Sequence, residues 1–166
     1  KIKTLYIMDA ESINSNNPID HVEDIIYSKQ WNFSRSTDDE LVAEIGSRWG
    51  TYRLYFSWSK AIKAINFTIT FDTKFAVNNN IHELLALINE KLWIGHFDIT
   101  SKGGILAFRH TIMVINDKDI MYSQIEEILD IIICECEKYY PAFQYLFFDN
   151  QSPQNALEFS SMETIG

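Results

Sequence analysis

The sequence predicts an α+β fold in which helices pack on an antiparallel five-stranded sheet, in the order α-βββ-α-ββ-α plus a short C-terminal helix. The strands are predicted by TYRLYFSWS and INFTITFDT, in which large apolar and polar side chains alternate with a period of two. The helices are predicted by NPIDHVEDIIYS and NNNIHELLALIN, where apolar side chains recur at helical spacing behind N-capping residues.

Length and composition indicate one folded domain. A chain of 166 residues buries about two-thirds of the surface that it exposes when unfolded. Its 46% hydrophobic and 22% charged residues are typical neither of a disordered chain nor of a disulfide scaffold. We expect an N-terminal extension, residues 1–16, and a single domain over residues 17–166. That domain includes a C-terminal helix at 152–163, with Ser152 as its N-cap.

The net charge of −9 argues against nucleic acid or an anionic membrane as partner, because such partners are held mainly by lysine and arginine. No apolar run approaches the roughly 18 residues that a membrane span needs. The opening segment has no apolar block followed by a small-residue cleavage site. We therefore expect a cytoplasmic protein.

The first helix begins after Asn17, a suitable N-cap, with Pro18 at its first position, and it should end near Gln30. A strand over residues 41–48 then precedes the two alternating segments, which form a hairpin if residues 60–63 are its turn. With this turn all large side chains face one side, and a one-residue slip would expose one whole set. The predicted partners are Ser59–Ala64, Trp58–Ile65, Phe56–Phe67, Leu54–Ile69 and Tyr52–Phe71.

A second helix should begin at the N-cap Asn80, with Glu83 completing a capping box, and stop at Gly95. Its apolar stripe comprises Ile81, Leu84, Leu85, Ile88 and Leu92. A last long helix should run from near Asp119 to Tyr139, because Pro141 blocks its extension. Within it Cys134 and Cys136 point about 200° apart, so they cannot share a disulfide or a metal, and we expect one in the core and one half-exposed.

The segment GHFDITSKGGILAFRHTI holds a glycine pair beside a lysine, as phosphate loops do. Phosphate loops lead from a strand into a helix, whereas here a strand follows, so we predict a hairpin with its loop at residues 101–104. This register pairs Thr100 with Ile105, Ile99 with Leu106, Phe97 with Phe108 and His96 with Arg109.

In that hairpin His96, Asp98 and Arg109 share the outer face, while His110 points inward. A metal bound by His96 and Asp98 would be repelled by Arg109 and has no evident third ligand. We therefore expect no metal, cofactor or catalytic residue. Two alternatives stay open: a small metal-dependent hydrolase using His96, Asp98 and His110, and a sensor whose small-molecule ligand lies between sheet and helices.

Aromatic residues make up 14% of the chain, more than one small core readily buries, so some should line an interface. The interaction surface that we predict comprises Trp49, Tyr55, Trp93, His96, Asp98, Arg109, Tyr140 and Phe143.

Several segments together resemble the YbjN family of bacterial sensory transduction regulators: DDELVAEI, RWGTYRLYFSW, IHELLALINEKLWIGHFD, FRH, ECEKYYPAFQYLFFD and SPQNALEFSSMETIG. The blocks LWIGHFD and YYPAFQ are the most distinctive, and the resemblance runs from about Asn17 to Gly166. It implies a fold like that of type III secretion chaperones and transfers no catalytic residue. The chain departs from the family where many relatives carry a glycine pair, at Phe148, Asp149 and Asn150.

The function that we expect is a non-enzymatic protein-binding, adaptor or chaperone-like module that regulates bacterial signalling or a stress response. Its partner would be a protein or client bound through some of the aromatic residues. We expect the module to be a homodimer. The chaperone-like and regulatory roles follow from the family resemblance alone.

Overall fold

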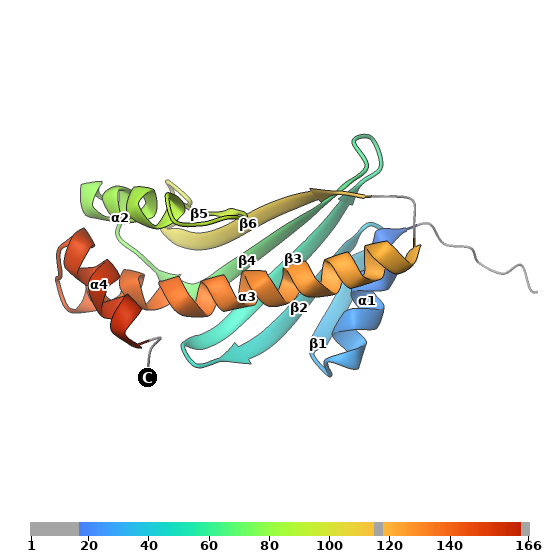
Figure 1. The fold of residues 1–166 in the computed structure, drawn as a ribbon, viewed down its shortest axis with the longest axis horizontal. Helices are drawn as coiled ribbons and strands as arrows, with labels where there is room; N and C mark the ends of the chain where they lie inside the picture. Colours follow the sequence, from blue (N-terminus) through green and yellow to red (C-terminus); the bar gives the residue numbers. More distant parts are fainter. Residues whose placement is uncertain (1–16, 115–117, 164–166) are drawn as a thin grey trace, which may run out of the picture.

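The computed structural model describes residues 17–114 and 118–163, so the N-terminal extension expected at residues 1–16 lies outside the described residues. The described chain confirms the α+β class with an antiparallel sheet (Figure 1). Its elements are α1 (Pro18–Ser28), β1 (Asn32–Thr37), β2 (Glu40–Ser47), β3 (Gly50–Ser59), β4 (Ala64–Lys74), α2 (Asn79–Asn89), β5 (His96–Ile99), β6 (Ile105–Met113), α3 (Lys118–Phe148) and α4 (Pro153–Glu163).

The sheet has six strands in the order β1-β2-β3-β4-β6-β5, so the prediction of five strands is wrong. The additional strand is β1, whose sequence NFSRST contains only one apolar residue, Phe33. Strand β1 lies at the sheet edge and buries few side chains. Its sequence therefore lacks the alternation of apolar and polar residues that identifies a half-buried strand. Phe33 pairs with Ala43 of β2, and this contact places its ring on the core side.

The predicted hairpin of β3 and β4 is confirmed in every pair, from Ser59 opposite Ala64 to Tyr52 opposite Phe71. Helix α3 crosses the face of the sheet on which the large side chains lie (Figure 1). The core between them is almost entirely apolar and aromatic, and Phe71 stacks on Tyr140 of α3 with ring centroids 4.5 Å apart. The opposite face carries most of the polar residues of β3 and β4, such as Ser57, Asn66 and Thr68.

The N-cap predicted for the first helix is confirmed, and the N-cap predicted for the second helix is wrong. Helix α1 starts at Pro18, and the side chain of its N-cap Asn17 accepts a hydrogen bond from the amide of Ile19. The N-cap of α2 is Asn78 rather than Asn80, since Asn78 has the extended backbone and its side chain accepts from the Ile81 amide at 3.1 Å. The sequence NNN contains three consecutive asparagines, and the pattern alone does not distinguish which of them is the N-cap.

Helix α2 ends at Asn89, not at Gly95. The side-chain amide of Asn89 donates to the carbonyl of Phe97 at 3.0 Å, and its oxygen accepts from the Phe97 amide at 2.8 Å. Asn89 therefore supplies β5 with the pair of hydrogen bonds that a neighbouring strand residue would supply. This interaction depends on a residue eight positions away, which the helical pattern does not reveal.

Helix α3 continues to Phe148, and Pro141 lies inside it, so the predicted end at Tyr139 is wrong. An interior proline costs about 3 kcal/mol. Burying a large side chain gains about 1.5–3 kcal/mol, and the turns around Pro141 bury Tyr139, Tyr140 and Phe143. The gain outweighs the cost. Although α3 has 31 residues, no helix in the described ranges combines the length and apolar character that crossing a bilayer requires.

The predictions for the cysteines and the C-terminal helix are confirmed. Cys136 is buried and Cys134 is exposed. Helix α4 ends at Glu163, and the hydroxyl of Ser152 accepts from the Asn155 amide at 3.2 Å as an N-cap. The turn between α3 and α4 uses Asn150 at φ +50°, a conformation that asparagine tolerates better than most residues.

The glycine pair of the β5–β6 hairpin has a structural role. Gly104 adopts φ +62°, and a Cβ atom there would overlap the carbonyl of Phe75 at the end of β4. Its own carbonyl accepts the Phe75 amide at 2.8 Å, which ties the hairpin to β4. The pair therefore builds a turn instead of cradling a phosphate.

We predict that Gly104→Ala lowers the free energy of unfolding by about 2–4 kcal/mol, because alanine meets both an unfavourable φ and a backbone clash. The matched control is Gly46→Ala in β2, where an added Cβ has nothing within 4 Å. The control should change stability by less than about 1 kcal/mol. Urea unfolding monitored by circular dichroism measures both, and equal midpoints would contradict the assigned role of Gly104.

Candidate functional site

The face of the sheet opposite α3 is the first candidate, and we call it the outer face. One row of paired residues crosses it from strand to strand: Tyr55 of β3 lies opposite Thr68, Thr68 opposite Arg109, and Arg109 opposite His96. The predicted β5–β6 register is thus confirmed. Asp98 lies on the same face, and its carboxylate accepts from Nε of Arg109 at 3.2 Å.

Four residues of the predicted interaction surface, Tyr55, His96, Asp98 and Arg109, therefore share the outer face. Their neighbours on the central strands are mostly threonine, serine and asparagine, and an amide–hydroxyl bond from Asn66 to Thr111 links β4 to β6. This face can offer hydrogen bonds to a partner, and its ion pairs can be replaced by ion pairs with that partner.

Trp93 lies in the connection between α2 and β5, three residues before His96, and its side chain is 99% exposed. Trp49, in the turn between β2 and β3, is half-buried instead, with the guanidinium of Arg48 4.8 Å from its ring centroid. The two tryptophans thus differ in environment. Only Trp93 presents its whole ring to solvent.

Two residues of the predicted surface, Tyr140 and Phe143, are buried, and their assignment to a surface is wrong. The hydroxyl of Tyr140 donates to Thr73 at 2.9 Å, and Phe143 packs on Phe97 with ring centroids 5.4 Å apart. The error has the same origin as the misplaced end of α3. Because the helix passes through Pro141, its following residues return to the core side.

The metal-dependent hydrolase is contradicted by the register of the hairpin. His96 and Asp98 lie on the outer face, whereas His110 pairs with Phe67 on the core side, so the three cannot converge on one ion. The guanidinium of Arg109 already contacts Asp98. Within the described ranges, no group of three or more potential metal-ligating side chains comes together.

Two titratable side chains of the core, Cys136 and Tyr52, have pKa values that keep them protonated. Burial raises the pKa of the Cys136 thiol well above its usual value, and Glu137 and Glu135 raise it further, so the thiol stays protonated at neutral pH. Burial likewise raises the pKa of Tyr52. A protonated thiol and phenol are weak nucleophiles.

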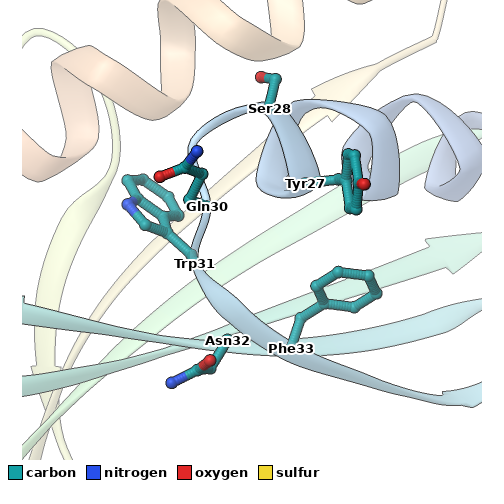
Figure 2. A pocket seen from close by; sticks show the side chains of 6 residues that line it. All are labelled: Tyr27, Ser28, Gln30, Trp31, Asn32 and Phe33. Carbon is teal, nitrogen blue, oxygen red and sulfur yellow. The ribbon is translucent and has the colours of Figure 1, made fainter.

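A pocket of about 600 Å³ lies between the end of α1 and the start of β1 (Figure 2). Its aromatic walls are Tyr27, Trp31 and Phe33, and the rings of Tyr27 and Phe33 lie across it from each other. The sequence pattern did not predict this site, because Tyr27 is on the polar side of α1 and the segment WNFSRS, although it turns towards the period of a strand, is not among the predicted strands. The available signal was the segment YSKQWNF, in which aromatic residues surround a helix end.

A second cavity, of about 420 Å³, lies where the sensor alternative would place its ligand, between the β2–β3 turn, α3 and α4. Its wall residues include Arg48, Trp49, Lys138 and Glu163. Arg48 already pairs with Glu163 at 3.4 Å, and the ammonium of Lys138 lies 4.8 Å from the ring centroid of Tyr139. Arg48, Lys138 and Glu163 are thus engaged with protein groups, and no feature of the cavity selects a ligand class.

Comparison with known proteins gives a family and a fold. The model of the YbjN family, described as putative bacterial sensory transduction regulator, matches residues 18–145. The chain is also similar to a solved structure titled "Crystal structure of YbjN, a putative transcription regulator from E. coli", with TM-score 0.52 and 10% sequence identity. The similarity covers 87% of this chain and 93% of that one, and at this identity it shows the fold alone. A search of curated proteins found no match.

The environment of His110 predicts how the stability of the protein depends on pH. Burial, and to a lesser extent His96, lower the pKa of His110 below its ordinary 6.5. As pH falls through the unfolded-state value, the unfolded chain takes up this proton before the folded protein does, so stability falls and then levels off below the folded pKa. His110→Phe should remove this part of the loss.

Urea unfolding at about pH 7.5 and about pH 5.5 measures the effect. The wild type should lose more stability between the two conditions than His110→Phe does. The matched control is His82→Gln, since His82 is exposed on α2, and it should behave as the wild type. An equal pH dependence in all three proteins would contradict the prediction.

Proposed function

The chain belongs to the YbjN family, and on that premise we propose that it is a non-enzymatic regulator that binds a protein partner on the outer face of its sheet. The observation that supports this most is the full exposure of Trp93 just before the β5 edge of that face. A tryptophan in water forgoes the free energy of burial. Burial against a partner recovers it, and tryptophan is the residue type most enriched among binding hot spots.

The chemistry of the outer face suits such a partner. Tyr55 is 38% exposed at the centre of the face and offers a second aromatic contact with a hydroxyl. Around it, polar side chains can form the hydrogen-bonded rim of an interface. The exposed Arg109–Asp98 pair contributes at most about 1 kcal/mol to stability, so either group can turn to a partner's charge at small cost.

The family description supports a role in bacterial signalling. We propose that this chain has such a role, or a role in a stress response, in the cytoplasm. A chaperone-like activity would use the same outer face to hold a client segment. The relation of the fold to type III secretion chaperones remains a prediction. We also propose that the protein is a homodimer.

We predict that Trp93→Ala and Tyr55→Ala each weaken partner capture about tenfold, because an aromatic hot spot contributes more than about 1.4 kcal/mol. Tagged wild type and variants would be incubated with lysate of the source bacterium, and captured proteins would be quantified by mass spectrometry. Stability should change by less than about 0.5 kcal/mol for the fully exposed Trp93 and by about 1 kcal/mol for Tyr55, which lies within a central strand.

The matched control is Ile62→Ala at the tip of the β3–β4 hairpin, which removes an exposed apolar side chain from another surface. A specific partner must be retained by this control and lost from Trp93→Ala. Identical captured sets from the wild type and from the double variant Trp93→Ala, Tyr55→Ala would contradict the proposed surface.

The homodimer predicts a solution mass of twice the 19.4 kDa of one chain. Size-exclusion chromatography with light scattering at tens of micromolar, roughly the range in which weak dimers persist, measures this mass. The mass of a single chain under these conditions would refute the dimer without affecting the proposed binding surface.

A further inference from the structure

The pocket between α1 and β1, lined by residues 27–28 and 30–33, lies at an open edge of the sheet, and we call it the edge groove (Figure 2). Among the described strands β1 pairs with β2 alone. The main-chain groups on the other side of β1 therefore have no strand partner within the described residues. An extended peptide is the ligand that complements such a row of amides and carbonyls.

The aromatic residues of the edge groove define what side chain it can take. Tyr27, on the last turn of α1, is 76% exposed, whereas Phe33 and Trp31 are half-buried and pack against the core. The groove volume of about 600 Å³ is in the range of pockets that bind ligands. Rings on both sides favour an aromatic guest, which can make edge-to-face contacts with each.

The charged residues beside the edge groove indicate which residues should flank the aromatic side chain of a bound peptide. Glu23 and Asp24 precede Tyr27 by four and three residues, so they share its side of α1. The two nearby cations are already paired with carboxylates: Arg35 contacts Glu23 at 2.6 Å and Asp20 at 2.8 Å, and Lys29 contacts Asp130 at 2.8 Å. The Lys29 ammonium also lies 5.6 Å from the ring centroid of Trp31. With the chain at a net charge of −9, the flanks of the groove favour lysine or arginine over acidic residues.

We propose that the edge groove binds an extended basic segment of a partner protein, which adds to the sheet beside β1 and inserts one aromatic side chain between Tyr27 and Phe33. The backbone edge accounts for the extended form, the facing rings for the anchor, and the carboxylates of α1 for the basic flanks. This surface is separate from the outer face. Recognition there goes beyond the proposed function and does not depend on Trp93 or Tyr55.

The probe is an acetylated and amidated octapeptide of alternating lysine and threonine, with one tryptophan in place of a central threonine. Calorimetric titration of the full chain should give saturable binding. Three matched peptides should bind at least about tenfold more weakly: one with alanine for tryptophan, one with glutamate for lysine, and one with alternate backbone amides methylated. The last peptide keeps the side chains but cannot pair as a strand.

Variants of the protein locate the site. Tyr27→Ala removes a wall at an exposed position, so it should fold normally and weaken the parent peptide about tenfold. Ile62→Ala and Trp93→Ala should bind as the wild type does. Retention of binding by Trp93→Ala keeps this test independent of the proposed partner on the outer face.

Four results would overturn the inference: no saturable binding of the parent peptide, equal affinity of the glutamate peptide, equal affinity of the methylated peptide, or undiminished affinity of Tyr27→Ala. A fifth concerns a different occupant. If Tyr27→Ala converts a dimer into a monomer in light scattering, a second copy of the chain occupies the groove, and a partner segment does not.

Discussion

The register of the β3–β4 hairpin is the constraint on which the rest of the structure depends. Because Phe56 lies opposite Phe67 and Tyr52 opposite Phe71, the large apolar side chains of the two central strands project to the same side, and Tyr55 is the exception on the outer face. That side must be covered, and α3 covers it with Tyr140 stacked on Phe71. The other side is left with threonine, serine and a few charges, so one register produces both the core and the uncovered face.

The parts of the fold that could be predicted are those in which local pattern and burial agree. Alternation was sufficient to pair β3 with β4 and β5 with β6 residue by residue, and Asn17 and Ser152 were recognisable caps. The parts that could not be predicted depend on partners distant in sequence. Strand β1 is stabilised by pairing with β2 without an apolar pattern of its own, and α2 ends where Asn89 binds Phe97.

The same division applies to the candidate sites. Strand alternation correctly placed His96, Asp98 and Arg109 on one face and His110 on the other, which is enough to separate the would-be metal ligands. It could not show that Tyr140 and Phe143 are buried, because proline statistics favour ending a helix that tertiary packing here prolongs. The edge groove depends on β1 and on a helix end, and neither has a strong periodic signal.

The turns of the β3–β4 and β5–β6 hairpins differ in the room that they leave for an added group. The turn at residues 101–104 is fastened to β4 through the hydrogen bond between Phe75 and Gly104. The turn at residues 60–63 accepts a hydrogen bond from the Val114 amide to the Lys63 carbonyl at 2.9 Å, but the side chains of Ala61 and Ile62 are exposed. A fluorescent label or an inserted epitope is therefore best accommodated between Ala61 and Ile62, where it leaves both candidate surfaces unobstructed for imaging or capture.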